Sequence, residues 1–411
     1  MAQGSDTKPA PPPSFEEHLR TTAGAFRTAI LQLMASVGAD PNRPQEVART
    51  LGLRSGLAWK VCKVAQEANV NAAVPHIPGS TGVKLFMDAV EKAGAPTDSV
   101  EAARSAGRDF ERMVEIHTGD RTTLEMMIGG MSAAPAQAEQ NRKLAYQGNS
   151  GTWGVRAKAQ MSLNILAPNA DSPDQCDLAQ VGGLLGFRRL RRDARWLLFR
   201  RERWTDEAPQ AEPDRSEPLD PECAAASGVP LMRDFCSSPL PAVDVVHAHA
   251  EEQIELPPGP IGNAAAMDCL YGIVSRAVGP AYASSPGEYS ELGVNLITPA
   301  EHVQLDVLVH RTLDWAMNPE AAIYSRLDGG ALHVSGRRDR NVLPAATDVQ
   351  DLGWGVGALA TPLMGGYLRL LRSAFDRLTW DPGDFRAFRV TMTYPPIPAV
   401  LMLRSELPAR D

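Results

Sequence analysis

Two histidines and a glutamate alternate along residues 247–251, as His247, His249 and Glu251. Alternate side chains of a β-strand point to the same face, so all three would point the same way. Imidazole and carboxylate ligands suit zinc or iron. A metal site would need at least one more ligand from elsewhere, and the sequence does not identify it. Exposed polar alternation explains the same residues, and we predict no metal site and no cofactor.

An acid–histidine couple of the hydrolase kind is suggested by Asp306 and His310, four residues apart in an alternating segment. At strand rise their Cβ atoms would lie about 13 Å apart, which is too far for a direct contact. No nucleophile, base and orienting group line up elsewhere, so we expect no catalytic residues. Sites are assembled in space rather than in sequence, so an enzyme with a site in the β-rich part stays open as the last-ranked class.

Two glycine-rich segments could suggest phosphate loops. Gly148, Gly151 and Gly154 recur every third residue, and residues 353–357 read GWGVG. Neither has the lysine that a phosphate loop places before its helix. We predict turns at both.

Arginines and aromatic residues interleave in residues 187–204, FRRLRRDARWLLFRRERW. This composition is typical of a groove that follows a nucleic-acid backbone and stacks its bases. It equally suits a strand pair with one solvated face, whose arginines pair with the acidic, proline-rich residues 205–221. A site for an acidic partner or a small anion is a third interpretation. The candidate anion or nucleic-acid patch comprises Arg188, Arg191, Arg195 and Arg200.

The segment Arg43–Gln66 has the pattern of two short helices joined by a turn. Pro44 suits a first helical turn, and Gly52 supplies the turn between the helices. The remaining apolar positions fall on the inward faces of the two helices: Val47, Ala48, Leu51, Leu53, Leu57, Ala58, Val61 and Val64 or Ala65.

This stretch resembles the helix-turn-helix of bacterial transcription regulators. The family pattern has a small residue in the first helix, a glycine four residues on, and apolar residues in the second helix. The resemblance implies that the second helix enters the major groove of double-stranded DNA, and that the protein is a homodimer. The residues it places at DNA are Arg43, Arg49, Arg54, Ser55, Trp59, Lys60 and Lys63.

Charge supports DNA binding only in part. The whole chain has a net charge of −8, which argues against a protein that coats nucleic acid indiscriminately. Residues 1–70 hold eight basic and six acidic side chains, so the excess has the right sign. Gly56 lies early in the second helix, where glycine costs about 1 kcal/mol. The alternative is a structural or protein-interaction role, in which the two helices only pack.

The order of the predicted helices and strands indicates an α+β fold. An all-helical part with the helix-turn-helix precedes a mixed, β-rich part. Strands are expected at 155–166, 187–204, 242–254 and 303–312, and a helix at 261–278. The predicted division is a disordered tail at 1–13, a helical domain at 14–132, a linker at 133–147, a β-rich segment at 148–204, an acidic loop at 205–221 and an α+β remainder at 222–411.

The cysteines and the hydropathy of the chain predict the compartment in which the protein resides. The five cysteines form no CxxC pair, which fits reduced thiols in a cytoplasm. No signal peptide or membrane span is expected. The 34 arginines against seven lysines suggest a GC-rich bacterial genome. The favoured interpretation is a cytoplasmic bacterial transcription regulator, whose C-terminal part senses a small-molecule effector or mediates assembly.

Overall fold

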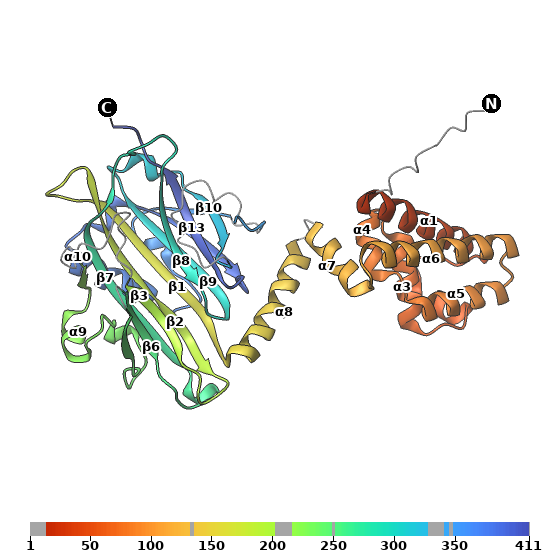
Figure 1. Cartoon of the computed structure of the whole chain (residues 1–411), viewed down its shortest axis with the longest axis horizontal. Helices are drawn as coiled ribbons and strands as arrows, with labels where there is room; N and C mark the ends of the chain where they lie inside the picture. The colour runs from red at the N-terminus through yellow and green to blue at the C-terminus, as the bar shows by residue number, and fades with distance from the viewer. Residues whose placement is uncertain are drawn as a thin grey trace, which may run out of the picture. The chain divides into compact units, whose positions relative to one another are not determined.

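The chain divides into two compact units, Met1–Ala138 and Glu139–Asp411. Helices form the first unit and β-strands dominate the second (Figure 1), which confirms an α+β fold with the helices first. The computed structural model describes residues 14–131, 135–201, 216–248, 251–327, 341–344 and 348–410. The predicted tail 1–13 and most of the acidic segment 205–221 lie outside these ranges.

The helical unit begins as the sequence predicts. Ser14 is the N-cap of the first helix, and its hydroxyl accepts a hydrogen bond from the Glu17 amide. Phe26 of this helix stacks on Phe110, at 6.4 Å between ring centroids. The elements are α1 (Phe15–Ser36), α2 (Pro44–Thr50), α3 (Ser55–Gln66), α4 (Val70–Ala73), the 3-10 helix η1 (Val74–His76), α5 (Ser80–Lys92), α6 (Thr97–His117) and α7 (Arg121–Met131).

Helix α8 (Pro135–Trp153) contains the boundary between the units. The predicted linker at 133–147 is therefore helical from Pro135 on, and the prediction of turns at Gly148 and Gly151 is wrong. Tyr146 and Ser150 lie one helical turn apart, both are buried, and the Ser150 hydroxyl donates to the Tyr146 carbonyl. This packing outweighs the helix penalty of two glycines, about 1 kcal/mol each. Gly154, at φ +72°, ends the helix.

A seven-stranded sheet is the centre of the second unit, with strand order β11-β12-β9-β1-β2-β7-β4. Strands β1 and β9 pair in parallel, and the other neighbours pair antiparallel. Its strands are β1 (Val155–Pro168), β2 (Gln175–Arg189), β4 (Ser216–Pro218), β7 (Met267–Pro280), β9 (Ala300–His310), β11 (Gln350–Trp354) and β12 (Phe385–Thr393).

Two smaller sheets and short helices complete the unit. One sheet has the order β10-β13-β8, and the other has the order β3-β6-β5. The strands are β3 (Trp196–Arg201), β5 (Asp244–Ala248), β6 (Glu251–Leu256), β8 (Tyr289–Leu296), β10 (Glu320–Ser325) and β13 (Ala399–Glu406). The helices are α9 (Pro221–Ser227), α10 (Tyr367–Leu378) and the 3-10 helices η2 (Arg233–Phe235), η3 (Asn263–Ala265), η4 (Asp314–Ala316), η6 (Gly357–Leu359) and η7 (Pro382–Asp384).

Both faces of the large sheet are covered. On one face, Leu163 and Ile165 of β1 belong to the same buried cluster as Leu371 and Phe375 of α10. On the other face, residues of β9 and β12 share a cluster with β8, β10 and β13. The sheet therefore has two apolar faces, which accounts for the long apolar runs of its strands.

The helix predicted at 261–278 is wrong, because residues 267–280 form strand β7. The spacing of Leu270, Ile273 and Val274 fits a helical face, but β7 lies between β2 and β4 in the sheet. Periodicity alone does not separate a buried helix from a buried strand.

The other strand predictions hold in part. Residues 155–166 and 303–312 fall on β1 and β9. Residues 187–204 hold the end of β2 and all of β3, but β3 pairs with β6, so the two halves form no hairpin with each other. Residues 242–254, predicted as one strand, hold the antiparallel pair β5 and β6.

Candidate nucleic-acid interface and other sites

The pair α2–α3 is set by proline and glycine at the predicted places. Pro44 starts α2, and Gly52 adopts φ +62° between the helices. The Leu53 amide donates to the carbonyl of Ala48 at 2.9 Å, which closes the end of α2. A left-handed conformation at this position suits glycine, which has no Cβ to clash.

Helix α3 separates an apolar face from a polar one. Its buried residues lie on one side: Ala58, Val61, Cys62, Val64 and Ala65. At 100° per residue, Ser55, Trp59 and Lys63 fall together on the opposite side, flanked by Lys60. Ser55 and Lys60 are exposed, Lys63 is half-buried, and the Trp59 side chain is 46% exposed.

The charge of the segment Arg43–Gln66 is strongly positive, with five basic side chains against one acidic one. The Arg43 guanidinium forms ion pairs with two neighbours, Asp40 at 3.7 Å and Glu46 at 3.3 Å. The other four basic side chains of the segment have no ion pair within the part of the chain that the structure describes: Arg49, Arg54, Lys60 and Lys63. Those four charges are available to an anionic partner.

Trp59 packs against the turn that follows α4. Its ring meets His76 edge to face, at 5.3 Å between centroids. Burial lowers the pKa of His76, Glu67 opposes that effect, and Lys63 and Lys60 lower the pKa further. His76 is therefore held neutral beside the two lysines, and it supports the position of the indole.

The predicted arginine patch is engaged with neighbours in the second unit. Arg195 lies 2.6 Å from Asp244, and Arg191 lies 3.6 Å from Asp193. Arg188 donates to Asn263 and lies 3.7 Å from Glu301. Arg200 lies in β3, in register with Gln253 of β6, and also has a partner. An anion would have to displace these contacts, so the geometry offers little support for the patch.

Among the described residues, the histidine candidates are not brought together with two or more other metal-ligating side chains. His247 is exposed and lies 3.8 Å from Glu252, while His249 lies outside the described residues. No group of three metal-ligating side chains occurs among the described residues. His310 contacts the Thr312 hydroxyl at 2.9 Å, and burial lowers its pKa.

Asp306 belongs to a buried polar network that the sequence analysis did not predict. The Asp306 carboxylate accepts hydrogen bonds from Nε and Nη2 of Arg389, each at 2.7 Å, and from the hydroxyl of Tyr367 at 2.5 Å. Gln304 donates to the same carboxylate at 3.0 Å and accepts from Thr361 at 2.7 Å. The network joins β9, α10 and β12 across the core, which gives it the character of a structural element. Two polar residues inside the apolar run of β9 were the available signal.

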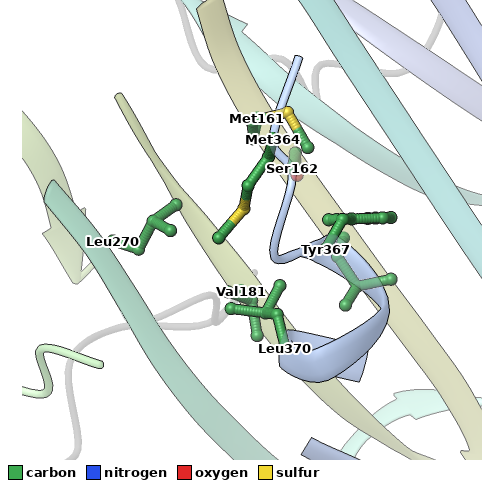
Figure 2. Close-up of a pocket in the computed structure, with 8 residues that line it drawn as sticks. Met161, Ser162, Val181, Leu270, Met364, Tyr367 and Leu370 are labelled. Carbon is green, nitrogen blue, oxygen red and sulfur yellow. The ribbon is translucent and has the colours of Figure 1, made fainter. Parts of the chain in front are cut away.

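A small cavity lies beside this network, between α10 and the sheet. Figure 2 shows Met161, Val181 and Leu270 facing Met364 and Leu370 across it. Its volume is about 10 Å³, which is close to the minimum for one water molecule. The cavity is therefore too small for a substrate-sized ligand.

Comparison with models of known protein families gave no match, and neither curated proteins nor solved structures yielded a similar chain. Among the described residues, no helix combines the length and apolarity that crossing a membrane requires.

Proposed function

We propose that the helical unit binds double-stranded DNA through the exposed face of α3, and that the protein is a transcription regulator. The observation that carries the proposal is the exposure of Arg54, Trp59 and Lys60 on a helix whose opposite face is buried. A recognition helix needs this division, because one face must fix the helix and the other must meet base edges.

The dimensions of α3 suit the major groove. Its 12 residues span about 18 Å, and the groove, about 12 Å wide, admits one helix. Arg54 would meet guanine acceptors, and Ser55 can bond to several bases. Trp59 would offer an apolar contact, and Arg49 would meet a phosphate.

Charge segregation supports the same surface. The segment Arg43–Gln66 carries a formal charge of +4, while Met1–Ala138 as a whole, with 14 basic and 15 acidic residues, carries −1. A basic segment on an otherwise acidic unit orients the unit toward a phosphate backbone. Three phosphate contacts per protomer, from Arg49, Lys60 and Lys63, would give a salt slope of about −3 per protomer.

A regulator of this kind acts as a cytoplasmic homodimer, and the resemblance to bacterial regulators supports that assembly. Two copies of α3 would then meet successive major grooves, about 34 Å apart. The second unit would sense a small-molecule effector or mediate the assembly.

Binding of the full chain to genomic DNA fragments across a salt series tests the proposal. Wild-type protein should retain a subset of fragments, and the pair Lys60→Glu and Lys63→Glu should abolish this retention. The matched control is Lys84→Glu with Lys92→Glu on α5, which makes the same charge change on exposed residues of the same unit. The control should bind as the wild type does.

Two results would contradict DNA reading by α3. One is equal retention by both double variants, which would place the contact elsewhere. The other is no retention of any fragment by folded wild-type protein at low salt. Loss of a protein partner on replacing Trp59, without any DNA binding, would favour an interaction role for the same face.

A further inference from the structure

A pair of cysteines lies in the core of the second unit. Cys236 follows η2, and Cys269 is in β7. The Ser237 amide donates to the Asp268 carbonyl at 2.9 Å, and residues 231 and 271 form an antiparallel bridge. These contacts hold residues 231–237 alongside β7, and Cys236 packs against the buried cluster that contains Cys269.

The two thiols differ in access. Cys236 is half-buried, whereas Cys269 is fully buried. The other three cysteines are buried as well: Cys62, Cys176 and Cys223. Cys236 is therefore the one cysteine of the chain that combines access to solvent with a second thiol in contact.

The surroundings of Cys236 favour its thiolate. The Cys236 thiol donates to the Leu270 carbonyl at 3.3 Å, and the Leu270 amide donates to the Cys236 Sγ at 3.3 Å. The amide contact favours the thiolate. The hydrogen bond with Cys269 lowers the pKa of Cys236, and burial opposes this effect. By contrast, burial raises the pKa of both Cys62 and Cys176 to about 11.

We propose that Cys236 and Cys269 are a peroxide-reactive pair that forms an intramolecular disulfide, with Cys236 as the attacking and Cys269 as the resolving thiol. Hydrogen peroxide is the oxidant. This site is independent of DNA binding by α3, because both residues lie in the second unit.

The chemistry balances in two steps. The Cys236 thiolate attacks one peroxide oxygen, the O–O bond breaks, and the departing hydroxide takes a proton to leave as water. The product is the sulfenic acid of Cys236. The Cys269 sulfur then attacks that sulfur, the S–O bond breaks, and the hydroxyl leaves as water with the Cys269 proton. Two thiols and one peroxide give one disulfide and two waters.

Peptide mapping of the full chain tests the pair. Folded protein is treated with a small excess of hydrogen peroxide and then alkylated under denaturing conditions. The number of alkylated cysteines should fall from five to three, and a peptide linking 236 to 269 should appear and vanish on reduction. The yield should not depend on protein concentration, because the bond forms within one chain.

Three serine variants locate the roles. Cys269→Ser should stop at a sulfenic acid on Cys236, trapped by dimedone. Cys236→Ser should leave Cys269 reduced after the same treatment. The matched control, Cys223→Ser, changes another fully buried cysteine of the same cluster and should keep the cross-link.

Some outcomes would overturn the proposal. These are oxidation of Cys236 to sulfinic acid while Cys269 stays alkylatable in the wild type, a disulfide only between chains, or no preference for Cys236 over the buried cysteines. Circular dichroism of each variant shows that it is folded, so a lost cross-link reports on the thiols themselves.

Discussion

Replacing Arg389 with methionine removes the cation from the buried network in the second unit. The Arg389 side chain is 8% exposed and that of Asp306 is 0% exposed, and two hydrogen bonds of 2.7 Å join them. Burial alone would lower the pKa of Arg389, but its contacts with Asp306 outweigh burial and raise it. The guanidinium is therefore charged in the folded protein.

The cost of Arg389→Met follows from what it leaves behind. Asp306 would keep two neutral donors, Tyr367 and Gln304, but would lose the compensating charge. An unpaired buried charge costs about 3–5 kcal/mol. The carbonyls that Arg389 also binds, at residues 359 and 360, would lose their donor. Since domains are stable by about 5–15 kcal/mol, we expect the free energy of unfolding to fall by roughly a fifth or more.

A double-mutant cycle separates the ion pair from general disruption. Asp306→Leu alone leaves a buried cation and should also cost about 3–5 kcal/mol. The combination with Arg389→Met leaves no buried charge, so it should cost several kcal/mol less than the sum of the single changes. Some cost remains, because Tyr367 and Gln304 lose an acceptor, at about 1–3 kcal/mol each.

Urea unfolding followed by tryptophan fluorescence measures these differences. Six of the seven tryptophans belong to the second unit, and Trp59 is the exception, so the signal reports mainly on the unit that carries the network. A loss below about 1 kcal/mol for Arg389→Met would refute the reasoning. Additivity of the two single changes would refute it as well, because a coupled pair cannot be additive.

Two further predictions concern glycine and tyrosine. Gly52→Ala should destabilise the helical unit by about 1–2 kcal/mol, because residue 52 has a φ of +62°. Gly56→Ala should stabilise the unit by up to about 1 kcal/mol, because a Cβ at this position of α3 meets open space. Hydrogen exchange of amides 44–66 measures both changes, and equal effects would contradict the turn geometry. Burial raises the pKa of Tyr271 to about 12. Burial and the neighbouring Asp306 carboxylate raise the pKa of Tyr367 well above its ordinary value. The two neutral tyrosines therefore stabilise the folded state fully below the unfolded pKa of about 10, and this contribution is lost as the pH rises through the folded pKa values. The urea midpoint should fall above about pH 10, and it should fall less steeply in Tyr367→Phe.

Local rules predicted those parts of the fold that depend on a few neighbouring residues. Pro44 starts α2, and Gly52 makes the turn before α3. Each feature rests on a backbone conformation or a cap within about four residues, so the sequence contains the whole cause. The exposed face of α3 follows equally from helical spacing.

Long-range pairing decided the elements that the sequence did not predict. Residues 267–280 satisfy a helical spacing but form β7, because β2 offers a partner strand. Asp306 looked like one end of an acid–histidine couple, yet its partner is Arg389, 83 residues away and directly opposite in the register of β9 and β12. In both cases the partner is distant in the sequence, so one segment alone cannot identify it.

The helical geometry of α3 makes fold and proposed function separable by experiment. Ala58 and Val61 are fully buried, so changes there act on stability and affect DNA binding only by unfolding the unit. Lys60 is exposed on the other face, and a change there should leave stability within about 0.5 kcal/mol. If the face reads DNA, replacing Lys60 and Lys63 with glutamine should weaken binding and lower the salt slope by about two per protomer, which instability alone would not do. A variant that binds more weakly, at unchanged stability and with a shallower slope, therefore assigns the effect to phosphate contacts of α3.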